Sequence, residues 1–268
     1  MKIAFFDSGI GGLSVLHHAM KILPHEEFIF FADEDNVPYG TKSPEEVLAC
    51  VDAAFKFLVE QGVSAIVVAC NTATSVAVVK MREKYSLPII GMEPALKVAL
   101  DTFPNRKVLV TATAITITGE KIRRLIGRLK AQDLAELKAL PRLVEFAERQ
   151  EFNSTAVEIY LRGELENYDW ESFSSIVLGC THFNYFKDTL RKILPPHIKI
   201  LDGNAGTVNE LIRRTRLKSA RNGSRIKLKS KKFFTARPNS SGGLFLSCPF
   251  SLVPCPLFCY NRKKFWRC

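Results

Sequence analysis

Two cysteines stand in matching surroundings and could do acid–base chemistry. Cys70 follows the apolar run 65–68, and Cys180 follows the apolar run 175–178; each is succeeded by hydroxyl or amide side chains and then by a helical pattern. Such runs are typical of buried parallel strands. A cysteine between a strand and a helix meets free backbone N–H groups and the positive end of the helix dipole, which predicts a lowered thiol pKa. The two cysteines lie 110 positions apart, so the fold must bring them together.

The elements that would position them alternate between strand and helix. Strands are expected over 3–7, 27–32, 65–70, 88–91, 107–112, 174–179 and 198–201; helices over 13–21, 44–61, 71–85, 118–130, 143–150, 155–161, 181–194 and 205–214. This alternation predicts α/β architecture with mainly parallel sheets. Ligands of such sheets bind at the carboxyl ends of the strands, where both cysteines fall.

Composition favours a soluble cytoplasmic protein. The chain has 268 residues, of which 47% are hydrophobic and 24% charged, ordinary values for one or two globular domains. The N-terminus reads as a strand and not as a secretory signal, and no run approaches the ~20 apolar residues of a membrane span. We therefore expect no membrane association, and thiols in place of disulfides.

The net charge of +11 belongs to the C-terminal part of the chain. From Arg216 onward there are thirteen Lys and Arg and no acid, leaving 25 basic and 27 acidic residues before it. The body therefore has no basic signature of nucleic-acid binding. Residues 236–268 are also rich in cysteine and proline, and we expect an atypical tail, disordered or read from a shifted frame. Zinc binding there is disfavoured, because no histidine follows His197.

Five motifs in one order resemble those of the glutamate racemases, in the cofactor-independent aspartate/glutamate racemase superfamily. They span most of 1–210 and lie at 6–15 (FDSGIGGLSV), 38–42 (PYGTK), 69–74 (ACNTAT), 91–95 (GMEPA) and 178–183 (LGCTHF). The resemblance implies two similar α/β domains around an active-site cleft, one cysteine from each. It gives a discontinuous first domain, 1–97 plus 207–235, and a second domain, 98–206.

The resemblance also implies interconversion of L- and D-glutamate, supplying D-glutamate for peptidoglycan. Racemisation removes the Cα proton from one face and returns one to the other, so two thiols on opposite sides suit it. By resemblance, Cys70 acts on the D-enantiomer and Cys180 on the L-enantiomer. Asp7 assists proton transfer at Cys70, and His182 tunes Cys180 or donates to the carbanion. Glu148 matches the family's acidic residue before the second cysteine, although Leu140-Pro141 replaces the usual Cys-Pro.

Substrate binding requires donors for two carboxylates and an acceptor for the ammonium. The candidates carry hydroxyl, amide or helix-terminal N–H groups, or belong to the loop that the family places over the substrate. They are Asp7, Ser8, Pro38, Tyr39, Gly40, Asn71, Thr72, Thr113, Thr116, Thr181 and His182. Thr113 and Thr116 stand in a threonine-rich segment whose register is ambiguous. No cofactor is expected, because the glycine turn after Asp7 lacks full dinucleotide-binding spacing: position 14 is Ser.

Two other readings stay open. The same thiols could racemise aspartate or another amino acid. In a different class, the chain could be a non-catalytic protein that binds nucleic acid through its basic tail. The sequence leaves the oligomeric state open, with a homodimer as the candidate.

Overall fold

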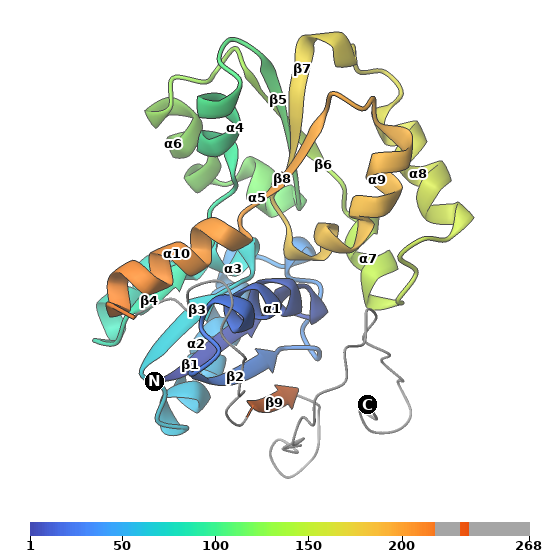
Figure 1. Cartoon of the computed structure of the whole chain (residues 1–268). Helices are drawn as coiled ribbons and strands as arrows, with labels where there is room; N and C mark the ends of the chain where they lie inside the picture. Colours follow the sequence, from blue (N-terminus) through green and yellow to red (C-terminus); the bar gives the residue numbers. More distant parts are fainter. Residues whose placement is uncertain (218–230, 236–268) are drawn as a thin grey trace.

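Two parallel sheets form the framework of the protein in a computed structural model that describes residues 1–217 and 231–235 (Figure 1). The first sheet has the order β4-β3-β1-β2-β9, and every pairing in it is parallel. Its strands are β1 (Lys2–Asp7), β2 (Glu27–Ala32), β3 (Ala65–Val68), β4 (Ile89–Gly91) and β9 (Lys231–Thr235). Strand β9 adds the most C-terminal described segment to the edge beside β2.

Helices cover both faces of the first sheet because alternate strand residues point to opposite sides. Ala4 and Phe6 pack with α2 (Pro44–Glu60) and α3 (Asn71–Lys84), whereas Ile3 and Phe5 pack with α1 (Leu13–Ile22) and α10 (Asn204–Thr215). Helix α2 begins with a capping box, in which Ser43 and Glu46 satisfy each other's backbone N–H groups. The burial of both faces explains why these strands read as continuous apolar runs.

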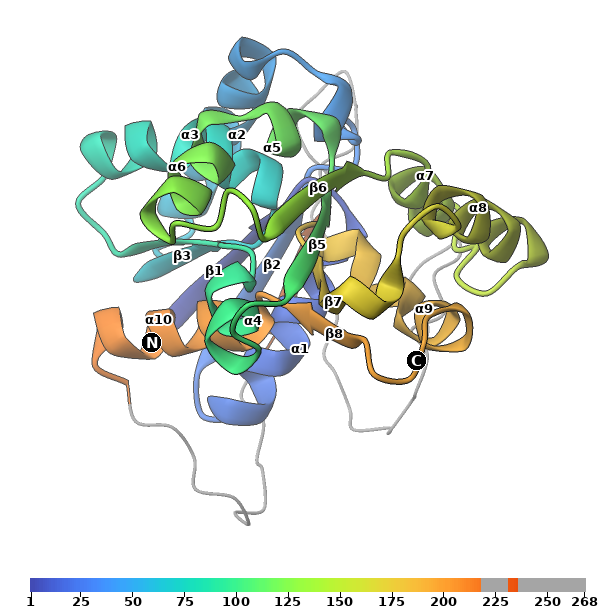
Figure 2. The ribbon, with the colours of Figure 1, turned by 90° about the horizontal axis from the view of Figure 1, so that it is seen from above.

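The second sheet is built from the middle of the chain, in the order β6-β5-β7-β8. Its strands are β5 (Lys107–Ala112), β6 (Ala135–Ala139), β7 (Phe173–Leu178) and β8 (Lys199–Asp202). One face packs against α4 (Leu96–Thr102) and α6 (Glu120–Arg128), and the other against α7 (Arg142–Glu148), α8 (Thr155–Leu165) and α9 (Lys187–Ile193) (Figure 2). The two sheets thus repeat one layered arrangement.

The chain crosses between the sheets twice, and the crossings touch. It leaves the first sheet after β4 and returns from β8 into α10. At Gly203, a Cβ atom would lie 2.6 Å from the carbonyl oxygen of Glu93, so a side chain there would clash with the outgoing crossing. Short 3-10 helices carry the loops at this boundary: η1 (Ile10–Gly12), η2 (Tyr39–Thr41) and η4 (Thr181–Phe186), with η3 (Trp170–Ser172) before β7.

The predicted α/β class with parallel sheets is confirmed, and a few local predictions need correction. The expected helix over 118–130 is present as α6, which begins after the extended Gly119 (φ −68°, ψ 150°); a separate short helix, α5 (Ala114–Thr118), precedes it and was not expected. The expected helix over 181–194 begins as the 3-10 helix η4 and becomes α-helical only in α9. Strand β6 and helix α4 were not expected.

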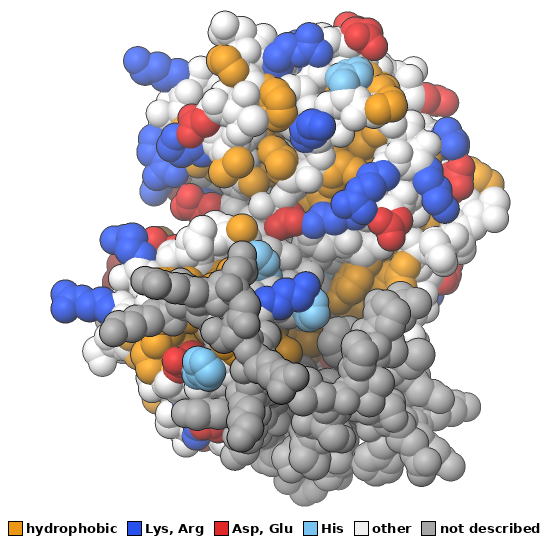
Figure 3. Space-filling view, in the orientation of Figure 1, with side chains coloured by type: hydrophobic (Ala, Val, Ile, Leu, Met, Phe, Trp, Pro, Cys, Tyr) orange, Lys and Arg blue, Asp and Glu red, His pale blue; other side chains and the backbone are white. Residues whose placement is uncertain are grey.

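Two sequence expectations concern the surface and the tail. Within the described ranges, the structure contains no helix long and apolar enough to cross a bilayer. On the face drawn in Figure 3, basic and acidic side chains are interspersed over the half that contains the second sheet. The prediction of an atypical or frame-shifted tail over 236–268 lies outside the described residues.

Candidate active site

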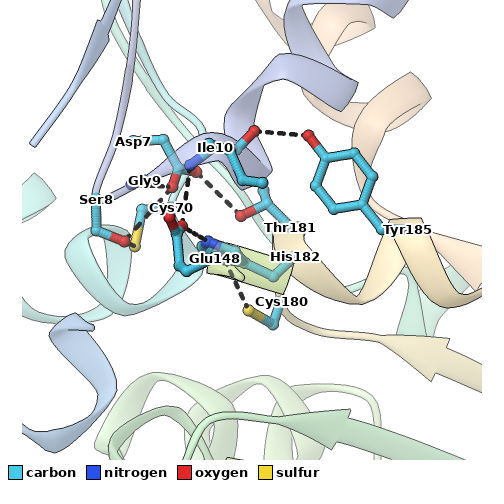
Figure 4. A network of polar contacts seen from close by, with 10 residues as sticks. All are labelled: Asp7, Ser8, Gly9, Ile10, Cys70, Glu148, Cys180, Thr181, His182 and Tyr185. Atoms are coloured by element: carbon cyan, nitrogen blue, oxygen red, sulfur yellow. Dashed lines mark hydrogen bonds and ion pairs between the residues drawn. The ribbon is translucent and has the colours of Figure 1, made fainter. Parts of the chain in front are cut away.

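Cys70 lies two residues beyond strand β3 and caps the N-terminus of helix α3. Its sulfur accepts a hydrogen bond from the backbone N–H of Ala73 at 3.4 Å. The same sulfur lies 3.6 Å from Oγ of Ser8 (Figure 4). Only 5% of the residue is exposed. The two contacts come from different strand-to-helix turns, because β1 and β3 are neighbours and end at the same edge of the sheet.

The expected lowering of the Cys70 thiol pKa is wrong for this geometry. Burial, the largest cause, and the negative charge of Asp7 raise its pKa to about 12, although the contacts with Ala73 and Ser8 act in the opposite direction. The helix N-terminus is present, but the loss of hydration outweighs it. The Cys70 thiol therefore keeps its proton at neutral pH. A charge on Cys180 also raises the pKa of Cys70, so the two sulfurs are near enough to interact.

Cys180 belongs to a linked group with His182 and Glu148. The Cys180 sulfur is 3.7 Å from Nδ1 of His182, and Nε2 of the same ring is 2.5 Å from Oε1 of Glu148. Cys180 follows strand β7, His182 lies in η4, and Glu148 is the last residue of α7. Sequence-distant elements thus place an imidazole directly between a thiol and a carboxylate, as Figure 4 shows.

The charge state of His182 follows from these two partners. Burial by itself lowers its pKa, but the hydrogen bonds and charges of Cys180 and Glu148 together raise the pKa of His182 well above its ordinary value. A protonated imidazole stabilises negative charge on the sulfur that it faces. The imidazole of His182 therefore faces the Cys180 sulfur as a cation.

Asp7 connects the two cysteine environments. Its Oδ1 accepts a hydrogen bond from the backbone N–H of Gly9 at 3.0 Å. Its Oδ2 accepts one at 3.0 Å from the hydroxyl of Thr181, which belongs to the half of the molecule that contains the second sheet. The carboxyl is completely buried. Burial raises its pKa to about 6, opposed by the charge of His182 and by both hydrogen bonds. Asp7 can therefore exchange a proton near neutral pH.

Glycine in the turn after Asp7 allows the halves to meet closely. A Cβ atom at Gly9 would lie 2.1 Å from Oε1 of Glu148, and one at Gly11 would lie 2.4 Å from Oγ1 of Thr181. The backbone of Ile10 is held from the second half at both ends: its N–H donates to Glu148 at 3.1 Å, and its carbonyl accepts the Tyr185 hydroxyl at 2.8 Å. Tyr185 was not predicted as a site residue, because its only signal in the sequence is its position three residues after His182.

The predicted hydroxyl donors gather at the same boundary. The hydroxyl oxygens of Thr72 and Thr113 are 2.9 Å apart, and that of Thr116 lies 3.0 Å from Thr113 and 3.4 Å from Thr72. Thr113 and Thr116, between which the sequence does not decide, thus both lie within hydrogen-bond distance of Thr72. The loop 38–40 joins them at Gly40, where a Cβ would lie 2.9 Å from the Thr113 side chain.

Asn71 and Tyr39 have partners that the sequence did not indicate. The side-chain amide of Asn71 donates to the sulfur of Met92 at 3.2 Å, while its carbonyl oxygen is buried without a hydrogen-bond partner among the described residues. An unpaired buried acceptor is costly, so this oxygen is suited to a donor such as the substrate ammonium. The hydroxyl of Tyr39 donates to Asp33 at 2.5 Å and is therefore occupied.

Every residue predicted for catalysis or binding thus belongs to elements that meet at one boundary between the sheets. Among the described residues, no group of three or more His, Cys, Asp or Glu side chains is arranged to hold a metal ion.

Comparisons with known proteins agree in both sequence and structure. A family profile for Asp/Glu/Hydantoin racemases matches residues 13–211. A glutamate racemase of Campylobacter concisus is 54% identical over 220 residues, covering 81% of this chain and 84% of the relative. The structure resembles glutamate racemase RacE1 of Bacillus anthracis (TM-score 0.77, 28% identity, 88% of both chains covered). It also resembles the Escherichia coli glutamate racemase in complex with L-glutamate and an activator (TM-score 0.76, 28% identity, 89% and 90% covered). The chain therefore belongs to the Asp/Glu/hydantoin racemase family.

Proposed function

We propose that this protein interconverts L- and D-glutamate by moving protons between Cα and two thiols, without a cofactor. The supporting observation is the arrangement of Cys70 and Cys180, each two residues beyond an interior strand of a different sheet, on opposite sides of one boundary. The relatives compared above are glutamate racemases, and the Escherichia coli structure contains L-glutamate. Its product D-glutamate would supply peptidoglycan synthesis.

The two thiols have different surroundings, which suit them to opposite roles. Cys70, with its pKa raised to about 12, holds a proton, whereas the protonated His182 faces the sulfur of Cys180, which would act as the base. The Cys180 thiolate removes the Cα proton of L-glutamate, and the Cys70 thiol donates its proton to the opposite face. The D-enantiomer leaves with Cys70 as the thiolate. Reaction from D-glutamate runs through the same steps in reverse.

The remaining site residues would hold the charges of the substrate. Hydroxyl and amide groups of Ser8, Asn71, Thr72, Thr113, Thr116 and Thr181, with backbone N–H groups of the loop 38–40, would bind the two carboxylates. Asp7 and the unpaired oxygen of Asn71 would receive the ammonium. Asp7 would also assist proton transfer at Cys70, because Oγ of Ser8 lies 3.4 Å from Oδ1 of Asp7 and 3.6 Å from the Cys70 sulfur.

Isotope labelling tests this mechanism directly. The wild-type protein is incubated with L-glutamate in D2O, and both enantiomers are separated at under about 10% conversion and analysed by mass spectrometry. Two thiols on opposite faces predict deuterium at Cα of the D-glutamate formed, while the remaining L-glutamate keeps its hydrogen. Equal labelling of both enantiomers would contradict the two-thiol mechanism, and no conversion would contradict the function. A parallel incubation with L-aspartate tests the alternative substrate, since faster conversion of aspartate would reassign the specificity.

We also propose where the protein acts, how its chain divides into domains and how it assembles. We place the reaction in the cytoplasm, because two catalytic thiols require an environment that keeps cysteines reduced. We propose that residues 1–97 with 207–235, and residues 98–206, are two domains. We further propose a homodimer, which light scattering coupled to size-exclusion chromatography would test by giving twice the chain mass of 30.1 kDa.

A further inference from the structure

One buried carboxylate, Asp33, has no part in the proposed proton transfers. It follows strand β2 directly and is 4% exposed. Its backbone N–H donates to the carbonyl of Asp7 at 3.0 Å, so the residue is anchored beside the end of β1. A buried carboxylate is costly unless it receives hydrogen bonds, and its partners therefore show what it stabilises.

The partners of the Asp33 carboxylate come from the loop that follows it. The side-chain amide of Asn36 lies 2.9 Å from Oδ1 and 3.1 Å from Oδ2, and the hydroxyl of Tyr39 donates to Oδ2 at 2.5 Å. Tyr39 is 1% exposed, and its ring centroid is 6.4 Å from that of Phe6. Hydrogen bonds to a buried charge are among the stronger ones in proteins. Asp33 therefore holds the segment 36–39 to the end of the first sheet.

Gly40, the residue after Tyr39, connects the segment held by Asp33 to the active site. Gly40 lies against Thr113, where an added Cβ would approach the Thr113 Cβ to 2.9 Å. Thr113 is in turn 2.9 Å from Thr72, which stands two residues after Cys70. A shift of the loop by a few tenths of an ångström would thus displace its backbone from the threonine hydroxyls proposed to bind substrate.

We propose that Asp33 is a positioning residue for substrate binding, which fixes the loop 36–40 against Thr72 and Thr113 through its hydrogen bond from Tyr39. This inference rests on the proposed glutamate racemase activity. The Tyr39 hydroxyl serves the loop and does not contact the substrate. Asp33 consequently affects how tightly glutamate is held and leaves proton transfer at the thiols unchanged.

A double-mutant cycle of Asp33→Asn and Tyr39→Phe tests the coupling. An amide has one acceptor oxygen and cannot receive both Asn36 and Tyr39 as the carboxylate does, while Tyr39→Phe removes only the hydroxyl. Each single variant should raise the KM for glutamate about 10-fold with kcat within about 2-fold, the effect of one strong hydrogen bond. The double variant should also show about 10-fold, because both changes break one interaction. Asp52→Asn, which alters an exposed carboxylate paired with Lys84, is the control and should leave KM unchanged.

The proposal would be overturned if the effects of the two changes multiplied, so that KM of the double variant rose about 100-fold. It would also be overturned if Tyr39→Phe, which retains the ring and its packing, had a KM within 2-fold of wild type. A lowered kcat with unchanged KM in either single variant would also contradict a role in binding.

Hydrogen exchange gives a readout that does not depend on activity. Amides of residues 34–42 should exchange at least about 10-fold faster in the Asp33→Asn full-length protein, with protection of β1 and β3 unchanged. Wild-type protection of this loop in Asp33→Asn would overturn the positioning role. If the wild-type protein failed to racemise glutamate, the proposed function would fall, and the exchange result would still decide whether Asp33 orders the loop.

Discussion

The Nε2 atom of His182 lies 2.5 Å from Oε1 of Glu148, so the imidazole that faces Cys180 is supported from behind by a carboxylate. The same Glu148 oxygen accepts the backbone N–H of Ile10 from the first half. One carboxylate thus sets the charge of the imidazole and also holds the glycine turn that follows Asp7. The residue that supports the imidazole facing Cys180 is therefore also a direct link between the two halves.

Replacing Glu148 by Gln should slow proton removal from L-glutamate. The amide keeps the size of the side chain and removes the charge that raises the pKa of His182. A less protonated imidazole stabilises the Cys180 thiolate less, and we expect kcat/KM to fall by about 10- to 100-fold. It must fall equally in both directions, because the equilibrium constant of racemisation is 1.

The direction-specific signature of Glu148→Gln is an isotope effect. The deuterium isotope effect on kcat/KM measured with Cα-deuterated L-glutamate should be larger in the variant than in the wild type, because proton removal by Cys180 becomes more rate-limiting. The isotope effect measured with Cα-deuterated D-glutamate should not increase. Glu145→Gln, on the exposed side of the same helix and paired with Arg149, is the control. An unchanged isotope effect for L-glutamate would separate Glu148 from catalysis.

Cys70→Ser and Cys180→Ser should each abolish racemisation and leave the fold intact. A serine hydroxyl is far too weak an acid to replace a thiol at either face. The remaining thiol should still exchange the Cα hydrogen of one enantiomer with D2O: L-glutamate in Cys70→Ser and D-glutamate in Cys180→Ser. Cys50→Ser is the control, because Cys50 is half-buried and is the cysteine of the described residues that lies outside the site; this variant should retain wild-type turnover. Near-normal racemisation by either active-site variant would refute the mechanism.

Asp7→Asn should reduce activity and yet stabilise the protein at neutral pH. The folded-state pKa of Asp7 is raised to about 6 from 3.8. The stability linked to its protonation is therefore complete below about pH 3.8 and is lost as the pH rises through about 6. Above pH 6 the buried negative charge costs on the order of 2 to 3 kcal/mol.

Urea unfolding at pH 5 and pH 8 measures this effect of Asp7. The gain in unfolding free energy of Asp7→Asn over wild type should be larger at pH 8 than at pH 5, while both variants share one m-value. A gain that is equal at the two pH values would show that burial does not raise the pKa of Asp7.

Activity should survive metal removal. The thiols, His182 and Asp7 supply all the acid and base groups that the mechanism requires, and we expect full turnover after exhaustive dialysis against EDTA. Turnover is measured by circular dichroism of glutamate before dialysis, after it, and after re-addition of single divalent metals. Activity that disappears on dialysis and returns with one metal would overturn the expectation of a cofactor-independent reaction.

The sequence predicts those parts of this protein that are encoded locally. Both cysteines, Asp7 and His182 stand at ends of apolar strand runs, and the parallel arrangement brings such ends together. Strand β6 was missed because its sequence, Ala-Glu-Leu-Lys-Ala, has no β-branched or aromatic residue and is only half-buried. The short helix α5 was missed because its sequence, Ala-Ile-Thr-Ile-Thr, is dominated by β-branched residues, which favour strands.

Properties that depend on tertiary burial could not be predicted in this way. The helix N-terminus at Cys70 is visible in the sequence, but the completeness of its burial is not, and burial decides the direction of its pKa shift. Asp33 gives no signal because its partners and its effect on Thr113 arise only from the folded loop. The same is true of the contact between Asn71 and Met92, which joins two strand ends.

The hydroxyl of Tyr185 donates a hydrogen bond across the boundary between the halves to the carbonyl of Ile10. Tyr185→Phe removes this hydrogen bond and keeps the ring, whose centroid lies 4.9 Å from that of Phe152. The loss should lower the free energy of unfolding by about 1 kcal/mol. It should also lower kcat/KM several-fold, because Ile10, in the glycine turn that follows Asp7 and Ser8, loses one of the two backbone hydrogen bonds that hold it to the second half.

The matched control for Tyr185 is Tyr168→Phe. Tyr168 packs against Phe173, at the opposite end of strand β7 from Cys180, so a six-residue strand of about 20 Å separates this hydroxyl from the site. Its removal should leave kcat/KM unchanged. Equal activity of the two variants would mean that the hydroxyl of Tyr185 contributes to stability alone, and that Glu148 by itself is sufficient to hold the turn at Ile10.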